Sequence, residues 1–355
     1  MQTTFDLLKI PSPTGDEGQI FTHIKALILK AWPNAIFMEW NNSLIASLPA
    51  KPNLKNISLI GHTDVVPNFF EPYVREGLLF GAGASDMKGS LGAYLQLLIE
   101  HGEKLCQNYN ISLVFYEKEE QTPMIENGLY ALIQKFPDYF KNLDLAIVGE
   151  PTDLNVHLGC VGSLHAEFTI KGKACHSARP WNGENAIYKA LPFLQGLAHL
   201  PTKPHEVCGV LFQDVVQVTE FQAEPGRTSL PGWVKGNVNF RFAPVYSVSE
   251  AEIVLANHFQ ALGLKKDEYR FLDVAPAAKV IETEFFKTVL ATLAQPLKAK
   301  QAWTDVAQLA ALGVPAFNFG AGLTDQAHKN DEMIPVVNLQ KYFDMLQKLL
   351  MESSL

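Results

Sequence analysis

Apolar and polar residues alternate along the first 150 positions in a pattern that predicts strands separated by helices. Short apolar runs at 56–60, 111–116 and 143–148 predict buried strands. Between them, apolar residues at helical spacing predict helices over 19–31 and 87–105. Strands separated by helices are typical of a mostly parallel α/β sheet.

The pattern changes near Gly159. Residues 163–170 alternate apolar and polar side chains, as a half-exposed antiparallel strand does. A small α+β unit is predicted here, with strands at 163–170, 215–221 and 234–242 and helices at 185–200 and 247–262. After about Ala275 the first style returns, with helices at 282–293 and 306–312, a strand at 314–319 and a last helix from Val337.

This change and its reversal predict an insertion. We expect a mostly parallel-sheet catalytic domain in two parts, residues 1–163 and 276–355. An inserted α+β domain then spans residues 164–275. A length of 355 residues agrees with two domains, since one domain usually takes about 100–200 residues.

Composition and charge narrow the class of protein. Apolar residues are 47% and charged residues 19%, which is ordinary for a globular chain. The net charge of −8 argues against a general nucleic-acid binder. No run approaches the ~18 apolar residues of a membrane span, and the first residues lack a basic leader. We therefore expect a soluble, cytoplasmic protein with no membrane partner. Its four widely spaced cysteines should be reduced and buried.

Acidic and histidine side chains follow four of the predicted strands. They are His62 and Asp64, Glu119 and Glu120, Glu150, and His328, and Asp86 stands just before a helix. Each motif alone is common in solvated turns, but ligands of open α/β sheets bind beyond the carboxyl ends of the strands. So many acids at one edge would repel each other without cations. Imidazole mixed with carboxylate suits Zn²⁺, with Co²⁺ or Mn²⁺ as alternatives.

The spacing His62-x-Asp64 adds a specific detail. A ligating histidine usually donates its second ring N–H to an acceptor that fixes its tautomer. An aspartate two residues along an extended chain lies on the same face and can be that acceptor.

Several motifs then resemble one enzyme family. The string at 61–67, Gly-His-Thr-Asp-Val-Val-Pro, resembles the first metal motif of the dinuclear zinc amidohydrolases and peptidases, and 83–89, Gly-Ala-Ser-Asp-Met-Lys-Gly, resembles the second. Glu119-Glu120, Gly149-Glu150-Pro151 and His328 follow in the family's order, and 172–178 is similar to part of its lid or dimerisation domain. The family includes acetylornithine deacetylase, succinyl-diaminopimelate desuccinylase and glutamate-releasing carboxypeptidases.

The resemblance covers almost the whole chain and implies a ligand set for two zinc ions per subunit. His62 and Glu150 would bind one ion, and Glu120 and His328 the other. Asp86 would bridge the two, with a cis peptide bond after it.

The resemblance also implies the roles of three further residues. Glu119 would be the general base, and Asp64 would support His62. His176 would reach the active site of the partner subunit in a homodimer and stabilise the oxyanion. The dimer would form through residues 164–275.

The segments 176–181, 302–307 and 313–320 look most like the succinyl-diaminopimelate desuccinylase branch. Its substrate is a small anionic N-acyl amino acid with three carboxylates and an ammonium group. Guanidinium groups bind carboxylates in a bidentate way. The candidate substrate-binding residues are Arg179, Arg227 and Arg241, with backbone N–H groups of Gly320 and Gly322.

Two departures and two alternatives remain. Many relatives carry arginine at Ala82, and many carry Asn-Val-Ile-Pro where this chain has Thr-Ser-Leu-Pro at 228–231. The second change weakens the assignment of substrate. Acetylornithine deacetylase, or another N-acyl-amino-acid amidohydrolase or carboxypeptidase, therefore stays open, as does a non-catalytic binding protein that kept the fold.

Overall fold

A computed structural model describes residues 1–120 and 122–352. The chain divides into two compact units. Unit 1 consists of Met1–Gly159, Val280–Lys298 and Thr304–Leu355, and unit 2 consists of Cys160–Lys279 and Ala299–Trp303.

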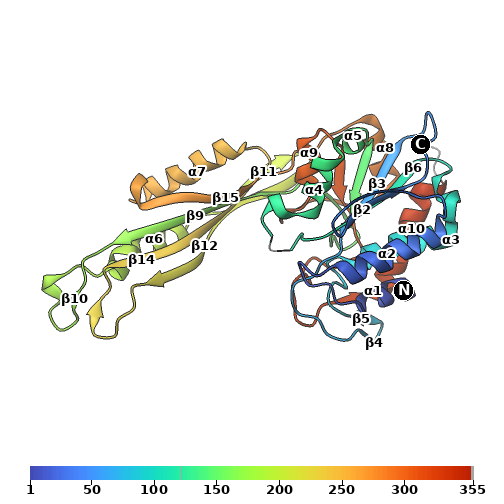
Figure 1. Cartoon of the computed structure of the whole chain (residues 1–355). Helices are drawn as coiled ribbons and strands as arrows, with labels where there is room; N and C mark the ends of the chain where they lie inside the picture. The colour runs from blue at the N-terminus through green and yellow to red at the C-terminus, as the bar shows by residue number, and fades with distance from the viewer. Residues whose placement is uncertain (121, 353–355) are drawn as a thin grey trace. The chain divides into compact units, whose positions relative to one another are not determined.

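An eight-stranded sheet forms the centre of unit 1, in the order β1-β2-β6-β3-β7-β17-β8-β16. Figure 1 labels β2, β3 and β6 of this sheet. Its strands are β1 Ile36–Trp40, β2 Ser43–Ser47, β3 Asn56–His62, β6 Asn110–Tyr116, β7 Leu145–Val148, β8 Val156–Leu158, β16 Leu297–Ala299 and β17 Ala316–Asn318.

The four central strands of this sheet are parallel. β3 pairs with β6 from Asn56↔Asn110 to His62↔Tyr116, and β7 lies parallel to both β3 and β17. β1, β2 and β8 pair antiparallel at the flanks. The predicted mostly parallel α/β sheet is therefore confirmed. The four parallel strands are almost entirely buried, which explains their continuous apolar runs.

Helices pack around this sheet. They are α1 Gln2–Leu8, α2 Gly18–Ala31, α3 Lys88–His101, α4 Gly128–Lys135, α5 Pro137–Lys141, α8 Glu284–Leu293, α9 Val306–Ala311 and α10 Val336–Gln347. α3 contacts β3 and also α1, α2 and α10, so it is buried on nearly every side. It ends four residues before the predicted Leu105, because Gly102 takes φ = 53° and the chain continues as a 3-10 turn.

A small three-stranded sheet lies beside the main one in unit 1. Its strands are β4 Tyr73–Arg75, β5 Leu78–Phe80 and β18 Met333–Pro335, in the order β18-β5-β4. β18 pairs antiparallel with β5 and so joins the segment after His328 to the segment before Asp86.

Unit 2 is built on a five-stranded antiparallel sheet in the order β11-β12-β14-β9-β15. Its elements are β9 Gly162–Lys171, β10 Cys175–His176, α6 Ala186–Ala198, β11 Lys203–Val207, β12 Val210–Ala223, β13 Ser229–Leu230, β14 Trp233–Phe242, α7 Val248–Ala261 and β15 Tyr269–Ala275. α6 packs on β9, β12 and β14, and α7 packs on β15 (Figure 1).

One face of the unit 2 sheet therefore forms a core with the two helices. Phe168, Phe193 and Phe259 meet there in edge-to-face contacts. The opposite face carries the polar residues of the alternating strands, as the sequence pattern indicates. β12 is longer than the predicted 215–221, because its first residues form a hairpin with the largely exposed β11, which the apolar pattern does not reveal.

The cysteines differ in part from the prediction. Cys106 and Cys160 are buried and free, but Cys175 is partly exposed and Cys208 is exposed. Cys208 stands at the tip of the β11–β12 hairpin with φ = 50°, where no core can cover it. Within the described part of the chain, no helix is long and apolar enough to cross a bilayer.

Candidate metal centre and active site

The parallel strands deliver acids and histidine to one edge of the unit 1 sheet. His62 is the last residue of β3, while Glu119 and Glu120 follow the end of the neighbouring β6. Glu150 comes two residues after β7, on the other side of β3. Parallel strands end at the same edge of a sheet. The position of residues 62, 119, 120 and 150 at or just after these strand ends is therefore enough to bring them together.

A compact group of ligand atoms forms at this edge. One atom from each of His62, Asp86 and Glu120 lies within 4.8 Å of the others, and all three residues are buried. His62 Nε2 lies 3.2 Å from Asp86 Oδ1 and 4.0 Å from Glu150 Oε1. His328 Nε2 lies 2.9 Å from Glu120 Oε2.

Asp86 presents its two carboxylate oxygens to different histidines. Oδ1 faces His62, whereas Oδ2 lies 3.7 Å from His328 Nε2. Two atoms that ligate one tetrahedral Zn²⁺ at about 2.0–2.2 Å lie roughly 3.3–3.5 Å apart. The separations are close to this value, and the donors are imidazole and carboxylate. The residues present therefore fit a metal site of the His/Asp/Glu kind.

The charges at this edge agree with cation binding. Burial by itself lowers the pKa of His62, but hydrogen bonds to Asp64 and Asp86 raise it well above its usual range. The hydrogen bond to Glu120 raises the pKa of His328 to about 9. Without a metal ion, protons on these histidines thus balance part of the carboxylate charge, and metal ions would displace them.

Glu119 lies beside this group. Burial raises its pKa well above the usual range for a glutamate; His62 opposes this shift, whereas Glu150 and Asp305 add to it. A carboxyl group whose raised pKa lets it hold a proton for part of a cycle has the character required of a general acid and base.

Asp64 does more than the sequence indicates. His62 Nδ1 lies 3.0 Å from the Asp64 backbone carbonyl and 3.5 Å from its carboxylate, so the carbonyl is the nearer acceptor. The carboxylate instead accepts the backbone N–H groups of Glu119 and Glu120, at 3.0 and 2.9 Å, and the Thr14 hydroxyl. Asp64 thereby fixes the segment after β6 relative to His62.

Glu332 is a site residue that the sequence reasoning missed. It is 2% exposed, and its carboxylate accepts the backbone N–H groups of Gly83, Ser85 and Asp86 at 2.7–2.8 Å. Burial raises the pKa of Glu332 to about 7, with Asp86 adding to the shift. The available signal was a pair of acids, Asp331 and Glu332, just before a short apolar strand and within four residues of His328. The Asp86–Met87 peptide is cis, as the resemblance implied.

In unit 2, His176 lies in the two-residue strand β10, which pairs with β13 as His176↔Ser229. The Ser177 N–H donates to the Thr228 carbonyl at 2.9 Å, so His176 and the unusual 228–231 segment are neighbours. The Ala178 N–H donates to His176 Nδ1 at 3.1 Å. Nδ1 is therefore an acceptor, and neutral His176 carries its proton on Nε2. The side chain is exposed.

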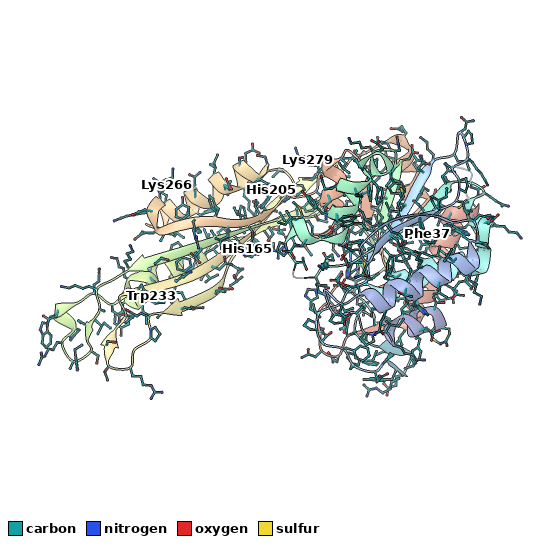
Figure 2. The ribbon with its side chains drawn as sticks, in the orientation of Figure 1. Phe37, His165, His205, Trp233, Lys266 and Lys279 are labelled. Atoms are coloured by element: carbon teal, nitrogen blue, oxygen red, sulfur yellow. The ribbon has the colours of Figure 1, made fainter. Side chains whose placement is uncertain are left out.

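The three candidate arginines do not gather within unit 2. Arg179 and Arg227 are exposed near the β10–β13 pair. Arg241 lies near the far end of β14, eight residues and roughly 26 Å from Trp233 at about 3.3 Å per residue. Its Nε donates to Asn239 Oδ1 at 2.9 Å. Arg241, Asn239 and His165 line a cavity of about 480 Å³ on the polar face of the sheet (His165 is labelled in Figure 2).

The glycines near β17 serve close packing. A Cβ on Gly320 would lie 2.3 Å from the Glu150 carbonyl oxygen, and one on Gly322 would lie 2.1 Å from that of Ser85. The Gly320 N–H already donates to Thr152 Oγ1 at 3.0 Å, so we do not retain Gly320 as a substrate donor. For Gly322 that role stays a prediction.

Comparison with known proteins agrees with this geometry. Residues 58–352 match the model of peptidase family M20/M25/M40. The chain belongs to this family. It is 31% identical over 351 residues to succinyl-diaminopimelate desuccinylase of Corynebacterium glutamicum, which covers 98% of this chain and 94% of the relative. The chain is thus a hydrolase of the M20 family.

Solved structures show the same fold. Aminopeptidase PepT of Bacillus cereus superposes with a TM-score of 0.79 at 17% identity, covering 99% of this chain and 97% of that one. A dinuclear metal-binding M20 peptidase of Bacillus subtilis superposes with a TM-score of 0.68 at 13% identity, covering 99% and 96%. At these identities the likeness concerns the fold, so we take the assignment of individual site residues from the geometry above.

Proposed function

We propose that this protein hydrolyses the amide bond of N-succinyl-LL-2,6-diaminopimelate, giving succinate and LL-diaminopimelate, a step of lysine and cell-wall precursor synthesis. The observation that carries the proposal is the 31% identity to a succinyl-diaminopimelate desuccinylase over nearly the whole length of both chains. The conjunction of His62, Asp86 and Glu120 at one sheet edge supports a metal-dependent hydrolysis. The cytoplasmic location stays a prediction.

We propose the ligand set that the resemblance implies. His62 and Glu150 would hold one ion, Glu120 and His328 would hold the other, and Asp86 would contribute a carboxylate oxygen to each. The two Asp86 oxygens, facing different histidines, support this division. When bound, two Zn²⁺ or Co²⁺ ions supply Lewis acidity and a water of lowered pKa. Mn²⁺ is the third candidate.

Glu119 is the proposed general base. Its carboxylate takes a proton from the attacking water and later passes it to the nitrogen of the leaving amine. Both tasks require the group to hold a proton for part of the cycle, and its raised pKa suits this. Asp64 holds the Glu119 backbone N–H at 3.0 Å, which limits movement of the base during the reaction.

Residues 164–275 are proposed as a lid and dimerisation domain, inserted between 1–163 and 276–355. In a homodimer, His176 of one subunit donates its Nε2–H to the oxyanion in the other subunit's site. The exposure of His176 and its Nδ1 contact to Ala178 support this role, since they leave Nε2–H free to point outward.

Of the three candidate arginines, Arg241 is the best placed to bind a substrate carboxylate. Asn239 Oδ1 accepts the Arg241 Nε–H, and Arg241 lines the cavity of about 480 Å³. Among the described residues, no carboxylate lies within ion-pairing distance of this guanidinium. Arg179 and Arg227, near His176, would then serve the partner subunit's site if the dimer forms as proposed.

A second candidate keeps the chemistry and changes the substrate. The fold is shared with an aminopeptidase, so acetylornithine or another N-acyl amino acid, or a short peptide, is the alternative substrate. The replacement of Asn by Thr228 favours testing it.

A substrate panel tests the proposal. The full chain, loaded with Zn²⁺ or Co²⁺, is assayed with N-succinyl-LL-diaminopimelate, N-acetylornithine, other N-acyl amino acids and a tripeptide. We expect kcat/KM for the succinyl substrate to exceed that for N-acetylornithine at least about 100-fold, because a site that binds carboxylates rejects analogues that lack them. Chelator-treated enzyme serves as the control. A preference for an acetyl substrate or a peptide would overturn the assignment.

A further inference from the structure

A fully buried carboxylate, Asp305, stands at the start of α9 in unit 1, outside the proposed ligand set. It accepts hydrogen bonds from three other side chains. Tyr116 Oη donates at 2.5 Å, Asn127 Nδ2 lies 3.3 Å from both carboxylate oxygens, and Gln308 Nε2 donates from the first turn of α9. Burying a carboxylate is costly unless its oxygens accept hydrogen bonds, so the three donors around Asp305 offset its burial.

Two of these donors border the segment that carries Glu119 and Glu120. Tyr116 is the last residue of β6, and Asn127 is the residue before α4. Asn127 Oδ1 also caps α4 by accepting the backbone N–H groups of Leu129 and Tyr130. The Asp305 side chain is thus hydrogen-bonded to residues at both ends of the segment that carries Glu119 and Glu120.

The base of the segment is closed by a backbone contact as well. The Gly128 N–H donates to the Glu117 carbonyl at 2.8 Å. A Cβ on Gly128 would lie 2.6 Å from that carbonyl oxygen, so only glycine permits the closure. The loop between β6 and α4 therefore has its two ends fixed together by the contact between Gly128 and Glu117. Asp305 is hydrogen-bonded to Tyr116 and Asn127 at these same ends.

The chemistry of the cluster explains why residue 305 is an aspartate. All three partners present donors, and only a carboxylate can accept all of them at once. An asparagine at 305 would place its own N–H₂ against at least one donor. Tyr116 also packs edge-on against the His62 ring, with centroids 6.3 Å apart, so the cluster touches the candidate metal site from a second side.

We propose that Asp305 is a positioning residue for the hydrolytic site. Through Tyr116 and Asn127 it fixes the loop that carries the base Glu119 and the metal ligand Glu120. The inference rests on the proposed function in so far as it assigns those two roles.

Tyr116→Phe is the sharpest test, because it removes one hydroxyl and keeps the ring against His62. Tyr139→Phe is a matched control. The Tyr139 hydroxyl is also hydrogen-bonded inside unit 1, to Ser112 on the same strand β6 at 2.5 Å and to Ser58 at 3.2 Å, but at the opposite end of the strand. Tyr116→Phe loses one internal hydrogen bond and Tyr139→Phe loses two, and only Tyr116→Phe touches the loop.

Each variant is measured for Co²⁺ affinity by calorimetry and visible absorption, and for kcat and KM. We expect Tyr116→Phe to weaken binding of one Co²⁺ about 10-fold, as removal of groups that orient ligands does. We expect kcat to fall about 10-fold with KM within about 2-fold. Tyr139→Phe should change neither. In the Glu119→Gln background at saturating Co²⁺, Tyr116→Phe should lower kcat less than it does in the wild type, because one of the two groups through which it acts is already gone.

Equal Co²⁺ affinity and kcat in Tyr116→Phe and Tyr139→Phe would refute the positioning role. Asp305→Asn should act in the same direction with a larger loss, and if it does not fold, Tyr116→Phe decides. A wild-type chain that binds Co²⁺ yet cleaves no N-acyl amino acid refutes the proposed function alone. The Co²⁺ comparison then still decides the role of Asp305.

Discussion

In unit 1 most of the candidate residues are buried, although His328 is exposed, whereas in unit 2 most of them project into solvent. His62, Asp86 and Glu120 are 1%, 8% and 4% exposed, and each contacts several other site residues. His176 and Arg179 are exposed and sit in a two-stranded ladder and the turn after it. This difference indicates that packing within unit 1 fixes the positions of His62, Asp86 and Glu120 before any ligand binds. The packing of unit 2 leaves His176 and Arg179 uncovered.

The largest effect should come from Asp86→Ala, which tests the preformed site in unit 1. Both proposed ions depend on this one carboxylate, so at least one metal ion per subunit should be lost. Activity should fall about 10⁴-fold or more, since metal chemistry supplies several kcal/mol of the barrier reduction. Elemental analysis and turnover are the measurements. Asp344→Ala, an exposed acid of α10, is the control. Two tightly held metal ions in Asp86→Ala would show that the ligand set is misassigned.

Glu119→Gln should have the next largest effect and separates catalysis from metal binding within the same unit. The variant should keep both metal ions, because Glu119 is not a proposed ligand, and lose about 10²–10⁴ in kcat. Glu126→Gln, an exposed acid in the same loop, should behave as wild type. Turnover of Glu119→Gln near the wild-type rate would remove this residue from the role of base.

His176→Ala should have the smallest effect on activity of the three substitutions. It tests the exposed candidate residues of unit 2. Loss of one oxyanion donor should lower kcat about 10²-fold or slightly more. The melting temperature should stay within about 1 °C, since the side chain is exposed and surface changes cost little. His199→Ala, another exposed histidine of unit 2, is the matched control.

Mixing inactive subunits shows whether His176 acts across a dimer interface. Glu119→Gln and His176→Ala subunits are combined under conditions that allow exchange. A hybrid dimer then contains one site with an intact Glu119 that receives an intact His176. An equal mixture should recover about one quarter of wild-type activity, because half the dimers are hybrids with one working site of two. Sedimentation as a monomer, or no recovery after proven exchange, would exclude the cross-subunit role.

The sequence was informative where function depends on local order. The apolar runs located β3, β6, β7 and β17 closely, and candidate acids and histidine stand at or soon after the ends of β3, β6 and β7. This worked because parallel strands must end at one edge, so chain position after a strand implies position in space. The hairpin partner β11 escaped detection because it is polar and exposed, and its place comes from pairing with β12.

By itself, then, the sequence determined the mostly parallel sheet and the residue types at the strand ends, because these follow from short-range patterns of polarity. Only the tertiary structure decided what holds those residues in place. Glu332 accepts the N–H of Asp86 from 246 residues away, and Asp305 accepts the hydroxyl of Tyr116 from 189 residues away. Glu332 and Asp305 are buried acids, and buried polar groups must be hydrogen-bonded. Tertiary packing determines which donors reach them, and the spacing of residues along the chain does not reveal those partners.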